Sequence, residues 1–284
     1  MKNILITGEN SYIGTSFEQY MKRYDGYEID TIDMIDGLWR EKDFSKYDAV
    51  FHVAGIAHSD VRNVSEETKK KYYAINTDLT VETAKKAKES GVAQFIFMSS
   101  MIVFGSKQDC ITKNTIPQPD NFYGDSKLQA DVRIHKLETD EFKVVSLRPP
   151  MIYGKGSKGN YPLLAKFAKI TPIFPNIDNK RSMLYIENLC EFVKLMIDNG
   201  ENGYFYPQNT EYVTTSDMVY QIALNNGKRI ILTKLFNPLI RLFRNNKIIK
   251  KVFGNMYYEK NMSQYKDQYN RVTFEKSIER AECV

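Results

Sequence analysis

Hydrophobic positions in the first half of the chain fall into short apolar runs that are separated by longer stretches with helical spacing. The apolar runs predict strands at Asn3–Thr7, Tyr27–Ile32, Asp48–Val53, Phe95–Ser99 and Phe142–Leu147. The stretches between them predict helices at Tyr12–Arg23, Glu66–Glu89 and Asn121–Leu137, of which the second ends at Gly91. Strands that alternate with helices indicate an α/β fold with a doubly wound parallel sheet.

This regular alternation ends after Arg148. A segment rich in Gly and Pro follows, and beyond it the expected elements are shorter and show no strand–helix repeat. We therefore expect two parts, residues 1–150 and residues 151–284. The second part is expected to be built on the carboxyl edge of the sheet, with some of its segments returning to the first part.

Composition places the chain among globular proteins, with 42% hydrophobic and 26% charged residues. No apolar run approaches the roughly 20 residues that span a bilayer, and the N-terminus has the pattern of a strand and not of a secretory signal. We expect a cytoplasmic protein. Neither the three cysteines nor the three histidines have the spacing of a disulfide framework or a metal site; they are Cys110, Cys190, Cys283, His52, His58 and His135.

Positive charge is concentrated near the C-terminus. Between Lys228 and Lys260 there are nine basic residues, and the only acid is Glu259. Such a region can face a diphosphate, a membrane surface or a nucleic acid. It contains no nucleic-acid-binding module and no repeated exposed aromatics, so we expect no nucleic-acid partner.

Within this basic region, the segment Asn237–Gly254 has the pattern of an amphipathic helix. Asn237 and Pro238 are a good helix start and Gly254 a good stop, although Asn245-Asn246 can split the helix. A basic amphipathic segment can rest on an anionic membrane surface. Alternatively, its apolar face packs on the protein and its charges are solvated. We favour the packed arrangement.

The first strand leads directly into a Gly-rich turn between Gly8 and Gly14. Such a turn presents backbone N–H groups and a helix N-terminus to a pyrophosphate. The middle position, which is often Gly in such loops, is Ser11, whose hydroxyl could donate a hydrogen bond to phosphate. Asp33 ends the second strand, where an acid binds a ribose 2′-hydroxyl and repels a 2′-phosphate. This pattern favours NAD over NADP, although Arg40 could still reach a phosphate.

Candidate catalytic groups follow later in the chain. Tyr123 and Lys127 are four residues apart and therefore lie on one helix face. A nearby cation favours the phenolate of a tyrosine and brings it into the working range of a base. Ser100 follows a strand at the edge where parallel sheets place ligands, and its hydroxyl can bond a substrate oxygen.

Five motifs in a fixed order carry a resemblance to a known family. They are the strand with Gly8–Gly14, His52–Gly55, Ser99–Gly105, Tyr123–Lys127 and Arg148–Gly154. From Met1 to about Asn199, the chain resembles the NAD-dependent epimerase/dehydratase family of extended short-chain dehydrogenases, which have a Rossmann-type sheet. Phe104 and Ser182 depart from the family, which usually has Tyr and an acid at these positions, and the C-terminal third is short and basic.

The resemblance implies an NAD(P)-dependent enzyme that acts on a nucleotide sugar, and it points to a sugar linked to UDP. It implies that Ser100, Tyr123 and Lys127 are catalytic, with Tyr123 and Lys127 also touching the cofactor. The implied cofactor-binding residues are Gly8, Asn10, Ser11, Tyr12, Ile13, Gly14, Asp33, Ala54, Gly55 and Pro149. Arg181, Asn160 and Ser100 are implied to bind the substrate. Two helices, Glu66–Glu89 and Asn121–Leu137, correspond to those that form a homodimer in many relatives.

The resemblance leaves the reaction at C4 open between two chemistries. Dehydratases of the family carry Asp-Glu where this chain has Met101 and Ile102, so dehydration is not expected. The segment from Arg148 to Ile186 is most similar to reductases of UDP-4-keto-6-deoxy-N-acetylhexosamines that serve surface polysaccharide synthesis, and we favour that reaction. The alternative is a UDP-glucose or UDP-N-acetylglucosamine 4-epimerase. A catalytically inactive NAD-binding regulatory protein is a remote third possibility, since such proteins usually lose the Tyr or the Lys.

Overall fold

The computed structural model describes residues 1–57 and 64–283 of the chain. His58, one of the histidines considered for metal binding, lies outside the described residues. Where the chain is described, no helix is both long enough and apolar enough to cross a membrane. No group of three or more His, Cys, Asp or Glu residues gathers there as a metal site either.

A six-stranded sheet forms one half of the molecule. Its strand order is β10-β6-β4-β3-β1-β2, and every neighbouring pair is parallel. The strands are β1 (Lys2–Thr7), β2 (Tyr27–Ile32), β3 (Ala49–His52), β4 (Gln94–Met98), β6 (Lys143–Leu147) and β10 (Gly203–Phe205). This is the doubly wound Rossmann-type sheet that the alternating pattern predicts, and five of its six strands lie where the apolar runs place them.

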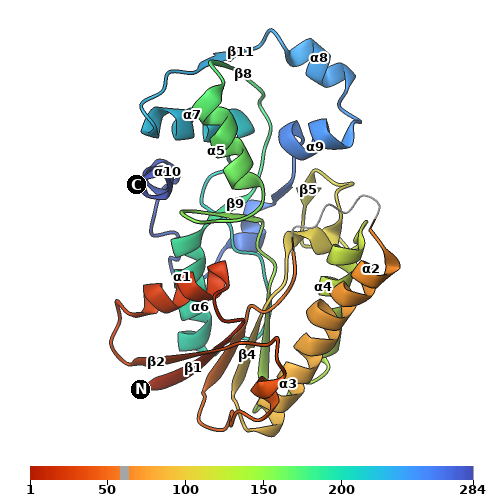
Figure 1. Ribbon diagram of the computed structural model, residues 1–284, viewed down its shortest axis with the longest axis vertical. Coiled ribbons are helices and arrows are strands. Elements are labelled where there is room, and N and C mark those ends of the chain that lie inside the picture. Colours follow the sequence, from red (N-terminus) through yellow and green to blue (C-terminus); the bar gives the residue numbers. More distant parts are fainter. Residues whose placement is uncertain (58–63, 284) are drawn as a thin grey trace.

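Helices cover both faces of this sheet (Figure 1). The helices α1 (Tyr12–Met21) and α6 (Ile186–Asn199) lie on one face, and α3 (Thr80–Glu89) and α4 (Phe122–His135) lie on the other. Strand β1 shows why the two cores form, because its side chains alternate between them. Ile4 and Ile6 belong to the core beneath α1, whereas Leu5 belongs to the core beneath α3 and α4. A strand buried on both faces has to be apolar throughout.

The predicted helix Glu66–Glu89 is continuous, but its middle is wider than an α-helix. It consists of α2 (Glu66–Tyr73), a π-helical stretch η2 (Ala74–Leu79) and α3. In such a stretch the hydrogen bonds skip one more residue, which rotates the side chains relative to a regular helix. As a result, the 3.6-residue pattern gives the extent of this helix but not the direction of the side chains in its middle.

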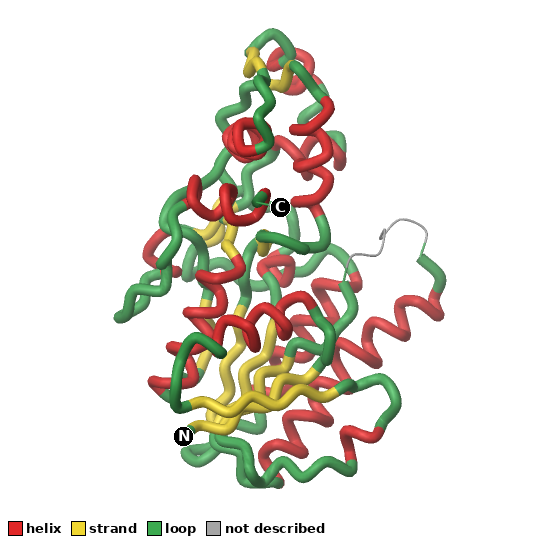
Figure 2. Tube along the Cα trace, turned by 60° about the vertical axis from the view of Figure 1, so that its left-hand side comes forward, coloured by secondary structure: helices red, strands yellow, loops and turns green. Residues whose placement is uncertain are grey.

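The remaining elements form a second half above the carboxyl ends of the strands (Figures 1 and 2). Its helices are α5 (Asn160–Ile170), α7 (Thr215–Asn225), α8 (Asn237–Leu242), α9 (Lys247–Phe253) and α10 (Phe274–Glu282). Three parallel strand pairs connect its segments: β8 (Ile173–Pro175) with β11 (Ile231–Thr233), β7 (Met151–Tyr153) with β9 (Met183–Tyr185), and β5 (Cys110–Ile111) with β12 (Tyr257–Tyr258). Short 3₁₀ turns lie at η1 (Leu38–Arg40), η3 (Met101–Phe104) and η4 (Lys260–Ser263).

The segment Asn237–Gly254 differs from the packed arrangement that we favoured from its sequence. It forms two short helices, α8 and α9, and the break between them falls at the residues that include Asn245-Asn246. Phe236, and not Asn237, is the N-cap residue of α8. No residue of α8 is buried, and the side chains of Leu239 and Leu242 are largely exposed. The expectation that the apolar face packs on the protein is therefore wrong for α8.

Candidate active site

The Gly-rich turn after β1 has a shape that admits little more than backbone. Gly8 has φ +92°, and a Cβ at this position would lie 2.9 Å from the Cα of Ala54. A Cβ at Gly14 would lie 2.7 Å from Ser11 Oγ and 3.0 Å from Ile6 Cγ2, so Gly14 allows α1 to pack closely on β1. Ser11 is the N-cap of α1, and its hydroxyl accepts from the N–H of Gly14 at 3.2 Å.

The cap by Ser11 leaves the first backbone N–H groups of α1 without a partner in the helix. The first N–H groups of a helix have no partner within the helix, and here they belong to Tyr12 and Ile13. Asn10, just before the cap, has φ +61°, a left-handed conformation that Asn tolerates better than most residues. The positive end of the α1 dipole and these N–H groups suit an anion such as a pyrophosphate.

Asp33 and Arg40 are placed differently relative to this turn. The N–H groups of Gly8 and Glu9 donate to the carbonyl of Ile32, which brings Asp33 to the edge of the turn. One carboxylate oxygen of Asp33 accepts from the N–H groups of Met34 and Ile35, which leaves its other oxygen for a ligand. The guanidinium of Arg40 makes a bidentate pair with Glu82 at 2.5 and 2.7 Å. Arg40 is therefore engaged, and a 2′-phosphate would have to compete with Glu82.

Ala54 and Gly55 form the wall opposite the Gly-rich turn. A Cβ at Gly55 would lie 3.0 Å from Asn76 Oδ1 and 3.1 Å from Lys127 Nζ, so a larger residue here would require these two side chains to shift by a few tenths of an ångström. Asn76 is fully buried in the π-helical stretch, where its side chain bonds the N–H and the carbonyl of Ile56 and the hydroxyl of Ser126. It fixes the chain after Gly55 to the helix that carries Lys127.

Ser100 and Tyr123 meet at the carboxyl end of β4. Ser100 is the N-cap of η3, and Tyr123 lies in the first turn of α4, whose N-cap is Asn121. Burial raises the pKa of Tyr123 to about 12, while a side-chain hydrogen bond with Ser100 acts in the opposite direction. Tyr123 is thus a neutral phenol in the ligand-free protein, able to donate a proton. The expected lowering of its pKa by Lys127 is not found in this state.

Lys127 lies one turn beyond Tyr123 and is almost completely buried. Its ammonium donates to the carbonyl of Met98 at 2.9 Å and lies over the ring of Phe97. Burial lowers the pKa of Lys127 to about 8, although the carboxylate of Asp131 favours the charged form. The bond to Met98 directs the ammonium toward the end of β4, beside Gly55. In this position Lys127 has little effect on the pKa of Tyr123.

A buried ion pair connects the three elements that carry these groups. Asp131 on α4 is fully buried, and one of its carboxylate oxygens accepts from Ser99 Oγ at 2.8 Å and from Arg148 Nε at 3.0 Å. Ser99 directly precedes Ser100, and Arg148 directly precedes Pro149. The Pro149 carbonyl in turn accepts from the N–H of Met101. The carboxylate therefore fixes the end of β4, the helix α4 and the end of β6 relative to one another.

The two expected substrate-binding residues lie in the second half of the molecule. Arg181 donates from Nη1 to the carbonyls of Lys251 at 3.1 Å and Gly254 at 3.0 Å, at the C-terminal end of α9. Burial lowers its pKa, and no carboxylate pairs with it among the described residues. Asn160 is the first residue of α5. In the part of the chain that the structure describes, no contact joins Asn160 to Arg181 or to Tyr123.

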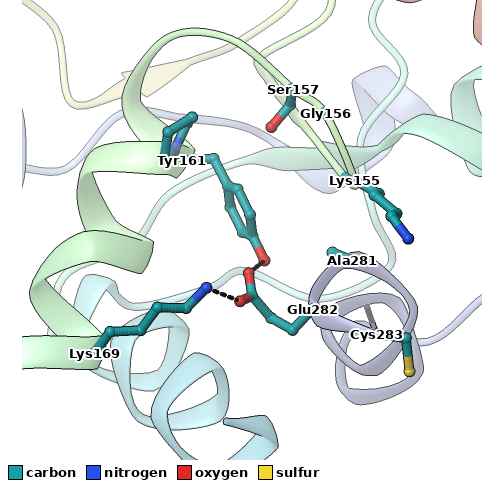
Figure 3. Close-up of a pocket in the computed structure, with 10 residues that line it drawn as sticks. Lys155, Gly156, Ser157, Tyr161, Lys169, Ala281, Glu282 and Cys283 are labelled. Carbon is teal, nitrogen blue, oxygen red and sulfur yellow. Dashed lines mark hydrogen bonds and ion pairs between the residues drawn. The ribbon is translucent and has the colours of Figure 1, made fainter.

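A separate pocket of about 340 Å³ lies between the start of α5 and the C-terminal helix α10 (Figure 3). Glu282 closes it by accepting from Tyr161 at 2.7 Å and pairing with Lys169 at 2.9 Å. None of Ser100, Tyr123 or Lys127 lines this pocket. We interpret the contacts of Glu282 as a structural connection that holds α10 against α5.

Two polar residues of the site, Asn76 and Asp131, were not singled out from the sequence. Their only signal was a polar side chain at a position that the pattern makes buried. Ser99 was noted only as the end of a strand and the start of a motif. His52 was noted only as part of a motif. Its ring is fully buried between Thr7 Oγ1 at 2.7 Å and Thr80 Oγ1 at 3.0 Å, and burial lowers its pKa to about 3. His52 is therefore neutral and joins β1, β3 and the start of α3.

The residues around the turn fit a dinucleotide. Gly8 provides the positive φ and the close approach to Ala54 that shape the turn, and the start of α1 offers N–H groups to a pyrophosphate. Lys127 is a desolvated cation beside Gly55, and one carboxylate oxygen of Asp33 takes no part in its bonds to Met34 and Ile35.

Comparison with known proteins is consistent with this geometry. A family model described as the NAD dependent epimerase/dehydratase family matches residues 4–207. The chain is 31% identical to the UDP-glucose 4-epimerase of Vibrio cholerae over 90% of this chain and 86% of that protein. It is 28% identical to the N-acetyl-α-D-glucosaminyl-diphospho-ditrans,octacis-undecaprenol 4-epimerase of Escherichia coli O157:H7, over 84% and 76% of the two chains.

Solved structures show the same fold at low sequence identity. The UDP-glucuronic acid 4-epimerase of Bacillus cereus, solved in complex with NAD, superposes with a TM-score of 0.71 at 16% identity. The superposition covers 99% of this chain and 97% of that one. The similarity in fold therefore includes the second half of the molecule, beyond residues 4–207 that the family model matches.

Proposed function

The chain belongs to the NAD-dependent epimerase/dehydratase family of enzymes, and on that basis we propose that it oxidises or reduces C4 of a nucleotide sugar, with Ser100, Tyr123 and Lys127 as the catalytic residues. One observation carries the assignment. The Tyr123 phenol and the Ser100 hydroxyl are hydrogen-bonded at the carboxyl end of β4, and the buried Lys127 ammonium lies at the end of the same strand, close to Gly55.

In the proposed reaction, each of the three side chains has one task at the sugar. The Tyr123 hydroxyl gives its proton to the C4 oxygen during reduction and takes it back during oxidation. The Ser100 hydroxyl donates a hydrogen bond to the same oxygen, which positions it and stabilises negative charge there. A bound nicotinamide supplies or accepts the hydride at C4.

Lys127 has an electrostatic task and a binding task. We propose that its ammonium turns from the Met98 carbonyl toward the hydroxyls of the nicotinamide ribose when the cofactor is bound. The positive charge then lies closer to Tyr123 and lowers the pKa of the phenol from its ligand-free value of about 12. We propose that this relocation, and not the ligand-free geometry, makes Tyr123 a base for the oxidative direction.

The remaining contacts are also assigned as proposals. The Gly8–Gly14 turn, with the N–H groups of Asn10, Tyr12 and Ile13 and the hydroxyl of Ser11, holds the pyrophosphate of the cofactor. Asp33 binds the adenosine ribose, and with Arg40 held by Glu82 this favours NAD over NADP. Ala54, Gly55 and Pro149 border the cofactor.

We assign the substrate diphosphate to Arg181, because it is a desolvated cation whose partners are carbonyls and not carboxylates. Asn160, at the start of α5, is the second proposed contact. The nucleotide is proposed to be UDP, in line with the name of the Vibrio cholerae relative.

Two reactions at C4 share this machinery. We propose 4-epimerisation as the first candidate, because the Vibrio cholerae and Escherichia coli relatives, which align with 90% and 84% of this chain, carry 4-epimerase names. An epimerase oxidises C4 and then reduces it from the other face, so it retains its cofactor between the two steps. The second candidate is the reductase that the sequence analysis favoured, which acts on a UDP-4-keto-6-deoxy-N-acetylhexosamine for polysaccharide synthesis. It stays a prediction, carried by the Arg148–Ile186 segment.

The deciding experiment measures bound nucleotide and product together. The purified protein is denatured, the released nucleotide is quantified, and fresh protein is incubated with UDP-glucose, UDP-N-acetylglucosamine or a UDP-4-keto sugar. Stoichiometric released NAD and 4-epimerised product without added cofactor support the epimerase. A requirement for added NAD(P)H, consumed in equal amount with a UDP-4-keto sugar, supports the reductase. Turnover of none of these sugars in either form overturns the assignment.

A further inference from the structure

The end of the molecule farthest from the sheet is formed by residues 228–251 together with the neighbouring strand β8, and we call this region the tip. Figures 1 and 2 show β8, β11 and α8 at the extreme of the long axis, opposite the N-terminal strands. Ile231 pairs with Ile173 across β11 and β8, and both side chains are exposed.

Large apolar side chains are concentrated on the surface of the tip. Leu235 is 79% exposed and Leu242 is 75% exposed, values expected for polar surface residues. Further exposed apolar side chains of the tip are Ile173, Ile231, Phe236, Leu239, Phe243 and Ile248. Single exposed apolar residues are common, but a concentration on one short segment indicates a contact surface.

The charge of the same segment has one sign. Residues 228–251 contain no aspartate or glutamate. Their basic residues are Lys228, Arg229, Lys234, Arg241, Arg244, Lys247, Lys250 and Lys251. Arg241 and Arg244 are exposed on either side of Leu242 and Phe243, so cations and apolar groups alternate over one turn of chain.

We propose that the tip docks on an anionic membrane surface, with the apolar side chains of α8 in the interface and the basic side chains against acidic headgroups. Helices with a basic polar face and exposed leucine and phenylalanine bind in this way. A second copy of this chain is a poor occupant, because its tip carries the same positive charge and would repel the first. An acidic lipid surface complements both the charge and the apolar groups.

Docking would also affect the proposed substrate site, because α9 connects the tip to Arg181. Arg181 Nη1 donates to the carbonyls of Lys251 and Gly254, at the far end of the segment that begins at the tip. A membrane that fixes α8 would therefore constrain the helix to which Arg181 is bonded. This link depends on the proposed role of Arg181, whereas docking itself does not depend on the enzyme's reaction.

The test is sedimentation of the full chain with vesicles, which needs no substrate. We expect the protein to pellet with vesicles of phosphatidylglycerol and phosphatidylcholine and to remain in solution with phosphatidylcholine alone. Added salt should release it, because counterions screen the attraction. Failure to pellet with acidic vesicles at physiological salt, or equal pelleting with both kinds of vesicle, overturns the proposal.

Paired variants separate the two contributions of the tip. Leu242→Ser with Phe243→Ser should weaken binding to acidic vesicles by at least about tenfold, because the apolar area that enters the interface is lost. Arg241→Glu with Arg244→Glu should weaken it similarly and flatten its salt dependence. Binding that is unchanged in both double variants overturns the proposal.

Matched controls place the same changes elsewhere on the surface. Ile116→Ser removes an 80% exposed apolar side chain outside the tip, and Lys22→Glu with Lys46→Glu reverses two exposed lysines on the half that carries the sheet. These controls should bind as the parent protein does. Light scattering on every variant identifies the competing occupant: if the tip variants dissociate an oligomer that the controls retain, the tip is a self-association surface and the proposal fails.

Discussion

At the scale of single residues, Tyr123 is a neutral phenol because burial raises its pKa to about 12. A neutral phenol suits the reductive direction, in which it gives a proton to the C4 oxygen. The oxidative direction needs the phenolate form of Tyr123. In our proposal the positive charge of Lys127 lowers the pKa of Tyr123 enough to form it, once the ammonium has left Met98. The two directions therefore make different demands on the same pair of side chains.

Replacing Tyr123 with phenylalanine tests the proton transfer. Tyr123→Phe should lower kcat by about 100- to 10,000-fold, the usual contribution of an acid–base group, while NAD(P) affinity stays close to that of the parent. Steady-state kinetics with cofactor titration by calorimetry measures both. Tyr73→Phe is the control. The Tyr73 hydroxyl bonds Asp125, which lies on the same helix as Tyr123, at 2.8 Å, but Tyr73 has no proposed catalytic role. An unchanged kcat in Tyr123→Phe would contradict the assignment.

The pKa of Lys127 predicts a pH dependence of cofactor affinity. Burial lowers that pKa to about 8, and the proposed ribose contact requires the charged form. Below pH 8 the free protein already holds the proton, so affinity should be constant. Above pH 8 binding has to take up a proton, so affinity should fall by up to about tenfold per pH unit until the pKa of the complex is reached.

The same titration with Lys127→Met provides the comparison. This variant should bind cofactor more weakly at pH 7 and show no fall in affinity as pH rises through 8. A fall in affinity that persists in Lys127→Met would assign the titration to another group.

Replacing Arg181 is predicted to lower the affinity for the nucleotide sugar but not the affinity for NAD(P). Arg181→Ala should weaken binding of the nucleotide sugar by about 1.5–3 kcal/mol, the range for charge-assisted hydrogen bonds, and leave NAD(P) binding nearly unchanged. Isothermal titration of each ligand separately is the measurement. Equal weakening of both ligands would mean that Arg181 acts only by holding the end of α9.

At the scale of elements, α4 is fixed by the carboxylate of Asp131. Asp131→Asn should lower the free energy of unfolding by about 3–5 kcal/mol, because it leaves the Arg148 guanidinium buried without its counter-charge. Urea denaturation measures the loss. The control is Asp78→Asn, which breaks the exposed pair with Arg133 of the same helix and should cost about 0–1 kcal/mol. Similar losses in the two variants would show that the buried Asp131–Arg148 pair stabilises the fold no more than the exposed pair does.

Local sequence signals predicted most of the elements of the sheet half and failed at specific places. The apolar runs gave the strands because a strand covered on both faces has to be apolar, as Leu5 and Ile6 are. The π-helical stretch at Ala74–Leu79 could not be predicted, because its extra residue is imposed by the contacts of Asn76 with Ile56 and Ser126. The exposure of α8 was missed because an apolar helix face looks the same in a sequence whether or not anything covers it.

Among the residues of the site, too, local spacing revealed some, whereas the role of others depends on contacts with distant parts of the chain. The placement of Ser100 at the end of β4 and of Tyr123 and Lys127 one turn apart on α4 was predictable, because it follows from local spacing. Asp131 was not, since its importance comes from Arg148 and Ser99, which the fold brings to it from two other strands. The engaged state of Arg40 depends in the same way on Glu82, 42 residues away.

At the scale of the whole molecule, we predict a homodimer formed through the helix of residues 66–89 and α4. These are the helices that the family resemblance points to, and Val132 on α4 is an exposed apolar side chain that such a contact would cover. Light scattering at micromolar concentration should give twice the chain mass, and Val132→Glu should give the monomer. A monomeric parent protein would remove this prediction.

Strand β10 has a consequence for how the chain can be divided. It pairs with β6 through Gly203–Phe205, and it follows α6, which packs beside α1 on the face of the sheet. A fragment that ends near residue 150 would leave the edge of β6 unpaired and the apolar side chains beneath α6 open to water, and it should aggregate. During synthesis the sheet can close only after the ribosome has passed residue 205. A proteolytic cut in the Gly-rich stretch after Arg148 should accordingly leave the two pieces associated.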